Sequence, residues 1–236
     1  MKLSVPFCLT FVVAAAAGSF AHSAEENPAE KLFGEMISKL NEAKTATFVV
    51  ESVVKDQFTL KANAKLKVGN KAHITITMRR AGAEDGTPML LVSDGTTQVT
   101  KAGDRRQPEQ PTPPTLVADI LGSIFHTGFM PAFTLSRRSS GDAASQPKLI
   151  DMIEVSEFQL GKREQINKRA AQAVTYQITS EQRQFNFKTT VWIDVKTKLP
   201  LKREIRLKQF SAVETYTQLK TNVKFDEKLF DTAAVE

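Results

Sequence analysis

The chain has 236 residues, with 32 Lys and Arg against 26 Asp and Glu, and Cys8 is its single cysteine. So small a positive excess suits a solvated exterior. The basic residues alternate with other residues along the expected strands and do not cluster with aromatic residues that could stack on bases. This distribution argues against nucleic-acid binding. Cys8 lies in a segment that we expect to be removed, which excludes disulfides, thiol catalysis and cysteine metal sites from the mature protein.

Residues 1–24 are predicted to be a cleaved targeting segment. Lys2 precedes an apolar run over residues 3–17, and small residues follow up to position 24. The apolar run is shorter than the roughly 20 residues that a membrane-spanning helix needs. We therefore predict cleavage after Ser23 or Ala24 and export to the periplasm.

The first elements expected in the mature chain are a helix and a strand meander. Apolar residues from Pro28 to Ala43 recur at intervals of three and four, which predicts an amphipathic helix. Beyond this helix the period changes to two, which is typical of half-buried strands, and Gly69-Asn70 and Asp94-Gly95 supply tight turns. The five expected strands run from Phe48 to Val54, Phe58 to Val68, His73 to Arg79, Met89 to Ser93 and Thr96 to Lys101.

The alternation stops between Gly103 and Lys148. Residues 105–114 are polar and proline-rich, residues 136–147 are rich in Ser, Gly and Ala, and both are predicted to be loops. Between them, residues 115–125 carry the broad apolar face of a short helix. A helix that interrupts a meander is expected to cover a face or an open end of the sheet.

The two-residue alternation of apolar and polar residues resumes after Met152, in at most six segments that are each expected to form a strand. The sequence therefore predicts a mainly β protein with some α structure: a curved antiparallel sheet, or incomplete barrel, of about 10 to 11 strands with short helices as a lid. Residues 25–236 are expected to form one domain, stable through burial alone. The runs lie near residues 153–160, 165–167, 173–180, 184–195, 200–210 and 212–223.

This order of elements resembles the periplasmic lipoprotein carrier superfamily with the LolA/LolB-like fold. The likeness rests on residues 91–96 (Leu-Val-Ser-Asp-Gly-Thr), 191–194 (Val-Trp-Ile-Asp), 197–202 and 223–226. The Arg-Pro of lipoprotein carriers is replaced here by residues 78–81 (Met-Arg-Arg-Ala), so the chain is more similar to the uncharacterised periplasmic branches, some of them called DUF2092. The resemblance implies a hollow that holds acyl chains, with the helix over residues 115–125 as part of its lid.

The apolar interior is the candidate ligand-binding site, because a strongly curved sheet encloses more volume than two short helices fill. Each buried methylene contributes about 0.8 kcal/mol, so a 14-carbon chain would bring on the order of 10 kcal/mol before ordering costs. The expected lid residues are Leu116, Ile120, Ile124, Phe125, Phe129, Met130 and Phe133, and the expected sheet residues are Phe58, Leu60, Ile74, Ile76, Phe185, Phe187, Val191 and Ile193.

Catalytic and metal signals are weak. Histidine catalysis would have to use His73 or His126, and no Gly-x-Ser-x-Gly elbow is present. His-x-x-x-His is absent, and Glu84-Asp85-Gly86 is interpreted as a turn, so neither a metal nor a cofactor is expected. Trp192 lies on the polar face of its strand and is expected to pack in a local core contact rather than to face a ligand.

The leading hypothesis is a non-catalytic periplasmic carrier or sensor that binds an amphiphile, with lipid or lipoprotein acyl chains as its partners. The first alternative is an interaction module that docks a membrane-associated protein partner at its sheet edge or lid. The second alternative is a hydrolase.

Overall fold

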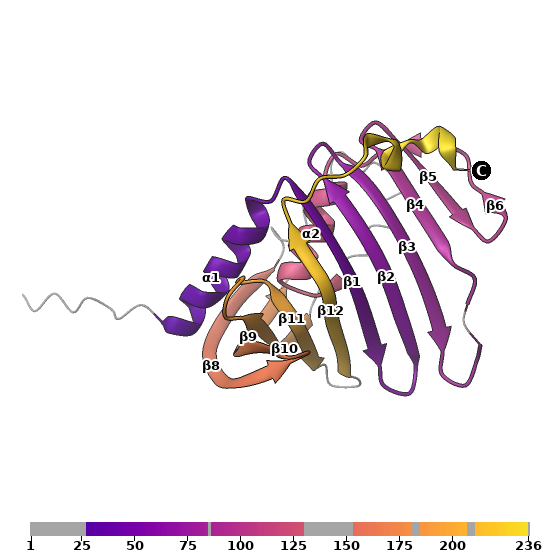
Figure 1. Cartoon of the computed structure of the whole chain (residues 1–236). Coiled ribbons are helices and arrows are strands. Elements are labelled where there is room, and N and C mark those ends of the chain that lie inside the picture. The colour runs from indigo at the N-terminus through magenta and orange to yellow at the C-terminus, as the bar shows by residue number, and fades with distance from the viewer. Residues whose placement is uncertain (1–26, 85, 130–152, 181–184, 207–210, 236) are drawn as a thin grey trace, which may run out of the picture.

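The computed structural model describes residues 27–84, 86–129, 153–180, 185–206 and 211–235 (Figure 1). They form one open, curved sheet of 12 strands in the order β6-β5-β4-β3-β2-β1-β12-β11-β10-β9-β8, with β7 paired to β5. The strands are β1 (Thr45–Val54), β2 (Phe58–Lys67), β3 (Lys71–Arg80), β4 (Met89–Asp94), β5 (Thr97–Ala102), β6 (Arg105–Arg106), β7 (Gln110–Pro111), β8 (Glu154–Ile166), β9 (Arg169–Ser180), β10 (Phe185–Asp194), β11 (Pro200–Arg206) and β12 (Ser211–Thr221).

All pairs of neighbouring strands are antiparallel, and the two halves of the sheet meet where β1 pairs with β12. Alternation of side chains gives the sheet an inner and an outer face. On β2, Leu60, Ala62 and Ala64 are buried on the inner face, whereas Lys61 faces out. The apolar residues of the inner face, together with those of the helices, make the main hydrophobic core.

Helix α1 (Pro28–Asn41) begins at a well-formed cap. The side chain of Asn27 accepts a hydrogen bond from the backbone N–H of Ala29 at 2.9 Å, and Pro28 occupies the first turn. Its buried stripe includes Phe33 and Met36 and packs against β8, β9 and α2. The predicted helix therefore forms, and it ends two residues earlier than Ala43.

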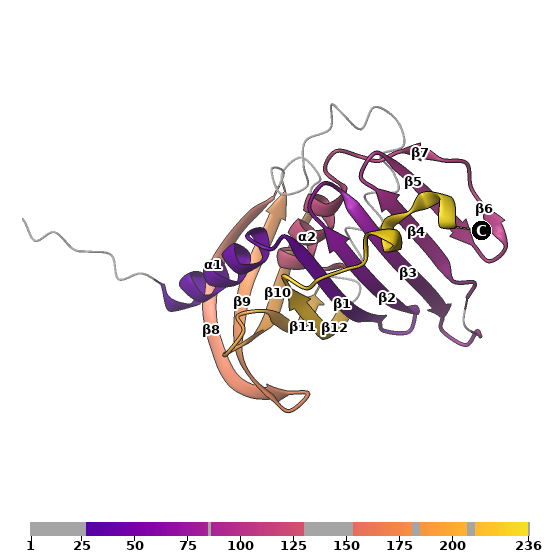
Figure 2. The same cartoon turned by 45° about the horizontal axis from the view of Figure 1, so that its top comes forward.

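Helix α2 (Leu116–Phe125) also lies on the inner side of the bend, behind β1 and β12 in the view of Figure 1. Figure 2 shows it in the same place, between the two halves of the sheet. The prediction of a short helix that covers a sheet face is confirmed. No helix in the described ranges is long and apolar enough to cross a membrane.

Two short 3-10 helices, η3 (Glu227–Phe230) and η4 (Thr232–Ala234), end the described chain. They lie on the outer face, beside β3, β4 and β5 (Figure 1). Val235 packs there with Val92 and Val99 in a small core that is separate from the main one. The outer face of this half is therefore partly covered by the chain's own C-terminal segment.

The predicted meander and its turns are confirmed. Gly69, Asn70 and Gly95 all have positive φ values, as these tight turns require.

Two details of the structure differ from the prediction. The segment predicted as a loop before α2 contains the short strands β6 and β7, and residues 165–167 are not a separate strand. Two register shifts interrupt the alternation of side chains within β8. The sequence pattern therefore suggests two strands where the structure has one continuous strand. The predicted targeting segment and the loop over residues 136–147 lie outside the described residues.

Leu60 offers a direct test of the inner core, because its side chain is fully buried, whereas Leu160 on β8 is 49% exposed. Leu60→Ala should lower the free energy of unfolding by about 2–5 kcal/mol. Leu160→Ala is the matched control and should change it by less than about 0.5 kcal/mol. Urea unfolding followed by circular dichroism measures both, and equal losses would contradict the assignment of the two faces.

Candidate binding site on the inner face

The structure brings most of the predicted site residues into one apolar core between α2 and the sheet. Phe58 packs half-buried at the edge of this core. Phe125 and Phe185 are terminal residues of α2 and β10, and Met130 and Phe133 lie outside the described residues. Buried together are Leu60, Ile74, Ile76, Leu116, Ile120, Ile124, Phe129, Phe187, Val191 and Ile193.

The side chains of Leu60, Val191 and Ile193 are completely buried. They therefore contact protein atoms and not an open hollow, and α2 occupies the space over this part of the inner face. A ligand could reach these side chains only if residues of the core that covers them, those of α2 among them, moved. The way in which α2 is held consequently decides what the site can do.

The N-terminal end of α2 is tethered to the turn between β2 and β3. Asn70 donates a hydrogen bond from Nδ2 to the carbonyl of Pro114 at 2.8 Å, and its Oδ1 accepts from the N–H of Val117 at 3.3 Å. Thr115 donates to the carboxylate of Asp119 at 2.6 Å within the first turn. Asn70 thus fixes where the helix starts while its own positive φ makes the tight turn.

The C-terminal end is held by a group of buried polar side chains, Tyr176, Arg203, Glu214 and Tyr216, which we call the polar clamp. Glu214 accepts a hydrogen bond from the N–H of Phe129 at 3.0 Å and another from the Tyr216 hydroxyl. Tyr176 donates to the carbonyl oxygen of His126 at 3.0 Å. The clamp therefore binds the backbone just after α2.

Gly128 lets the chain approach the clamp. Its φ is +98°, and a Cβ built there would lie 2.6 Å from a carboxylate oxygen of Glu214. Any larger residue would push the backbone away from the carboxylate and would be strained at this φ.

Arg203 and Glu214 face each other across β11 and β12, and both are 0% exposed. Burial alone would lower the pKa of Arg203, yet Tyr176, Tyr216 and Glu214 hold that pKa above its ordinary value. Burying two charges is costly unless they compensate each other. These two residues thus form one energetic unit under the end of α2.

Two hydroxyls flank this pair on the same face. Ser52 lies opposite Glu214 on β1, and Thr189 lies on β10 opposite Tyr176. Within the described part of the chain, both hydroxyls are buried without a hydrogen-bond partner. Each such group costs roughly 1–3 kcal/mol. The inner face therefore contains polar groups that gain hydrogen bonds if α2 moves and admits water or a ligand.

An aromatic cluster joins α1 to the same region. The ring of Phe33 lies 4.7 Å from that of Tyr176, 5.2 Å from that of Phe158 and 5.8 Å from the imidazole of His126, between ring centroids. His126 Nδ1 lies 2.9 Å from the carbonyl oxygen of Gly122. Burial lowers the pKa of His126 to about 4, and the positive charge of Arg203 adds to this effect.

His73 lies on the opposite, outer face of the sheet. It is paired in register with Lys65 on β2, and burial and the charge of Lys65 lower its pKa. The two histidines are therefore separated by the sheet and cannot share a catalytic site. In the described ranges no three His, Cys, Asp or Glu side chains are grouped as metal ligands would be.

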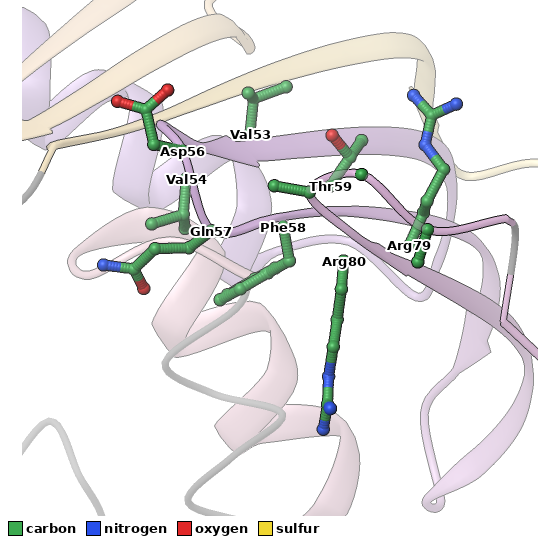
Figure 3. A pocket seen from close by; sticks show the side chains of 11 residues that line it. Val53, Val54, Asp56, Gln57, Phe58, Thr59, Arg79 and Arg80 are labelled. Carbon is green, nitrogen blue, oxygen red and sulfur yellow. The ribbon is translucent and has the colours of Figure 1, made fainter.

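A pocket of about 320 Å³ lies between the turn from β1 to β2 and the end of β3 (Figure 3). Val53, Phe58, Arg79 and Arg80 are among its lining residues. In Figure 3 the side chains of Phe58 and Arg80 extend to the side on which α2 lies, and that of Arg79 extends to the other side. The pocket thus reaches the edge of the inner face.

Sequence reasoning missed the polar clamp and this pocket. The signal for the clamp was available, because Arg203 and Glu214 take inner-face positions in otherwise apolar alternations with Ile205 and Tyr216. The expectation for Trp192 is confirmed. It is buried with Ala173 in a small outer-face core, and the Lys202 ammonium lies 4.3 Å from its ring centroid.

The buried charge pair predicts a non-additive response. Glu214→Leu should lower the free energy of unfolding by about 3–5 kcal/mol, because it removes the charge opposite Arg203. The double variant Arg203→Met with Glu214→Leu should be more stable than Glu214→Leu alone, because no buried charge is left. Chemical denaturation of wild type, Arg203→Met, Glu214→Leu and the double variant measures the coupling, and simple addition of the two single losses would contradict the pairing.

His126 predicts a pH dependence. Unfolded, it binds a proton below about pH 6.5, but folded only below about pH 4. The unfolded state therefore binds more protons between these values, and stability falls as the pH is lowered through them, by up to about 3 kcal/mol from this group. The slope of the unfolding free energy against pH gives the number of protons taken up on unfolding. In His126→Gln this number should be smaller by close to one between pH 4 and pH 6.5. An unchanged slope would argue against a buried, neutral His126.

The fold is similar to that of two solved mycobacterial proteins. Lipoprotein LppX from Mycobacterium tuberculosis aligns with a TM-score of 0.50 and 16% identity, over 84% of this chain and 99% of LppX. LprF from Mycobacterium bovis aligns with a TM-score of 0.52 and 12% identity, over 83% of this chain and 94% of LprF.

LolA superfamily protein NE2245 from Nitrosomonas europaea also aligns, with 12% identity over 86% of this chain and 98% of that protein, but its TM-score of 0.29 is too low to support an argument. No protein-family model and no curated protein sequence matches the chain. At these identities the similarity shows the fold alone, which this chain shares with LppX and LprF.

Proposed function

We propose that this protein is a non-catalytic periplasmic carrier or sensor, which binds the acyl chain of an amphiphile on the inner face after α2 has moved aside. The observation that carries the proposal is the attachment of α2. A short apolar helix covers an apolar sheet face and is tethered at its ends by backbone hydrogen bonds, which Asn70 and Glu214 accept and Tyr176 donates. Such a cover can be exchanged for a ligand of the same polarity.

The free energy needed to move α2 aside and the free energy gained by binding an acyl chain are of similar size. Each clamp hydrogen bond contributes about 0.5–1.5 kcal/mol net, with more for those to Glu214. An acyl chain that takes the place of the apolar side chains of α2 would gain about 0.8 kcal/mol per buried methylene. A chain of a dozen carbons would bring about 10 kcal/mol, against which stand these few hydrogen bonds and the apolar side chains that α2 exposes when it moves. The buried hydroxyls of Ser52 and Thr189 lower the cost of opening further.

The mycobacterial lipoprotein LppX shares the fold, which is consistent with an extracytoplasmic role. The predicted targeting segment over residues 1–24 supports the same location. We assign no reaction to the protein, because His126 is turned to a backbone carbonyl and His73 lies on the other face.

The interaction-module alternative has one feature in its favour. β8 spans 13 residues at the end of the sheet and is mostly exposed, so its outer edge could pair with a partner strand. Its two register shifts and the positive φ of Glu157 weigh against this, because bulges discourage strand addition. Amphiphile binding on the inner face is therefore the better supported function.

A fluorescent apolar probe tests the proposal with the mature chain. Wild type should bind the probe saturably. Tyr176→Phe should bind it several-fold tighter, because the variant loses the bond to the His126 carbonyl and opens more often, by a factor of about 5 for 1 kcal/mol. Ile76→Asp should bind it much more weakly, because it places a charge on the sheet surface against which the acyl chain would lie.

Val195→Asp is the matched control, since Val195 is 37% exposed and lies outside both the main core and the pocket. It should bind the probe like wild type. Circular dichroism of each variant confirms that it is folded. Lack of saturable probe binding by wild type, or equal affinities in all four proteins, would overturn the proposal.

A further inference from the structure

The inner face is not covered evenly along β3. Ala72, Ile74 and Ile76 are buried, but the next inner-face residue, Met78, is 41% exposed, and Arg80 beyond it is exposed. The uncovered part of the inner face therefore lies at the C-terminal end of β3, away from the end at which Asn70 holds α2.

The neighbouring strands continue this opening. Phe58 on β2 pairs with Arg80, and Met89 on β4 pairs with Ile76, so both residues lie on the inner face. Both are half-buried and pack against the main core. We call Phe58, Met78, Met89 and Leu91 the uncovered corner. It is an apolar surface that is continuous with the core beneath α2, and its methionines can adapt to chains of different shape.

Arg80 stands at the outer end of this corner. Its side chain extends past Phe58 on the α2 side of the pocket (Figure 3). Within the described ranges Arg80 makes no ion pair or side-chain hydrogen bond, whereas the buried charge of Arg203 is compensated by Glu214. The positive charge at the edge of the inner face is therefore available to a ligand.

We propose that Arg80 binds the acidic headgroup of the amphiphile, so that the preferred ligand is an alkyl or acyl chain that ends in a carboxylate or a phosphate. This inference rests on the proposed function and adds the class of headgroup to it. A guanidinium donates paired hydrogen bonds to either group in a fixed planar geometry. The chain would extend from Arg80 across the uncovered corner toward α2, with its head in the pocket and its tail in the apolar core.

Isothermal titration calorimetry with the mature chain tests this assignment. The probes are dodecanoate, dodecyl phosphate, the uncharged dodecanoyl glycerol and inorganic phosphate. Wild type should bind the two anionic probes about 3- to 5-fold tighter than the uncharged one, as expected for a partly exposed ion pair. The preference should shrink as salt is added. Inorganic phosphate should bind far more weakly than dodecyl phosphate, because it lacks the tail.

Arg80→Gln should remove the preference and leave the affinity for dodecanoyl glycerol unchanged, which also shows that the variant is folded. Arg105→Gln is the matched control, because it removes an exposed guanidinium on β6, outside the pocket, and it should keep the preference.

An equal preference in wild type and Arg80→Gln would overturn the headgroup assignment while leaving amphiphile binding intact. Inorganic phosphate that binds as tightly as dodecyl phosphate would overturn it too, since the site would then hold a free anion. Failure of wild type to bind any of the tailed probes would instead overturn the proposed function.

Discussion

The buried pair of Arg203 and Glu214 is the interaction on which the arrangement of the inner face depends. Two full charges lie inside the bend of an otherwise apolar sheet, where they are stable only as partners. Glu214 uses its remaining hydrogen-bonding capacity on Tyr216 and on the backbone of Phe129. The position of α2 is therefore tied to the electrostatics of the sheet, and the close approach of Gly128 follows from the same requirement.

In the function that we propose, this dependence would allow a stable protein to have a movable cover. The core between α2 and the sheet is apolar and non-directional, so it tolerates replacement of one apolar surface by another. The hydrogen bonds at the ends of the helix are directional and specify the closed arrangement. Closure is thus set by a few polar contacts, whereas the affinity for an acyl chain would come from the surface beneath. Arg80, at the edge, would add selectivity without taking part in closure if it binds the headgroup as we propose.

The sequence allowed much of the fold to be predicted, because alternation and turn residues are local signals. The meander up to Lys101, the first helix and α2 all follow from periodicity and from pairs such as Asp94-Gly95. The alternation of apolar and polar residues does not predict strand bounds where a bulge shifts the register, as in β8. The polar clamp could not be assembled in the same way, because Tyr176, Arg203 and Glu214 meet through pairing of β9 to β12, which no local pattern specifies. The exposure of Met78 likewise depends on where α2 comes to lie.

The pairing of β1 with β12 has a consequence for how the protein is made. Thr217 on β12 and Val49 on β1 are hydrogen-bonded although they are 168 positions apart in the chain. The seam of the sheet therefore cannot form until nearly the whole polypeptide has emerged from the ribosome, and contacts of such long range slow folding. Until then β1 exposes an open edge next to its apolar face, a state that is prone to aggregation. A chain whose two halves cannot pair until its last strand is complete is also one whose sheet can still be kept open while it is threaded through a narrow channel.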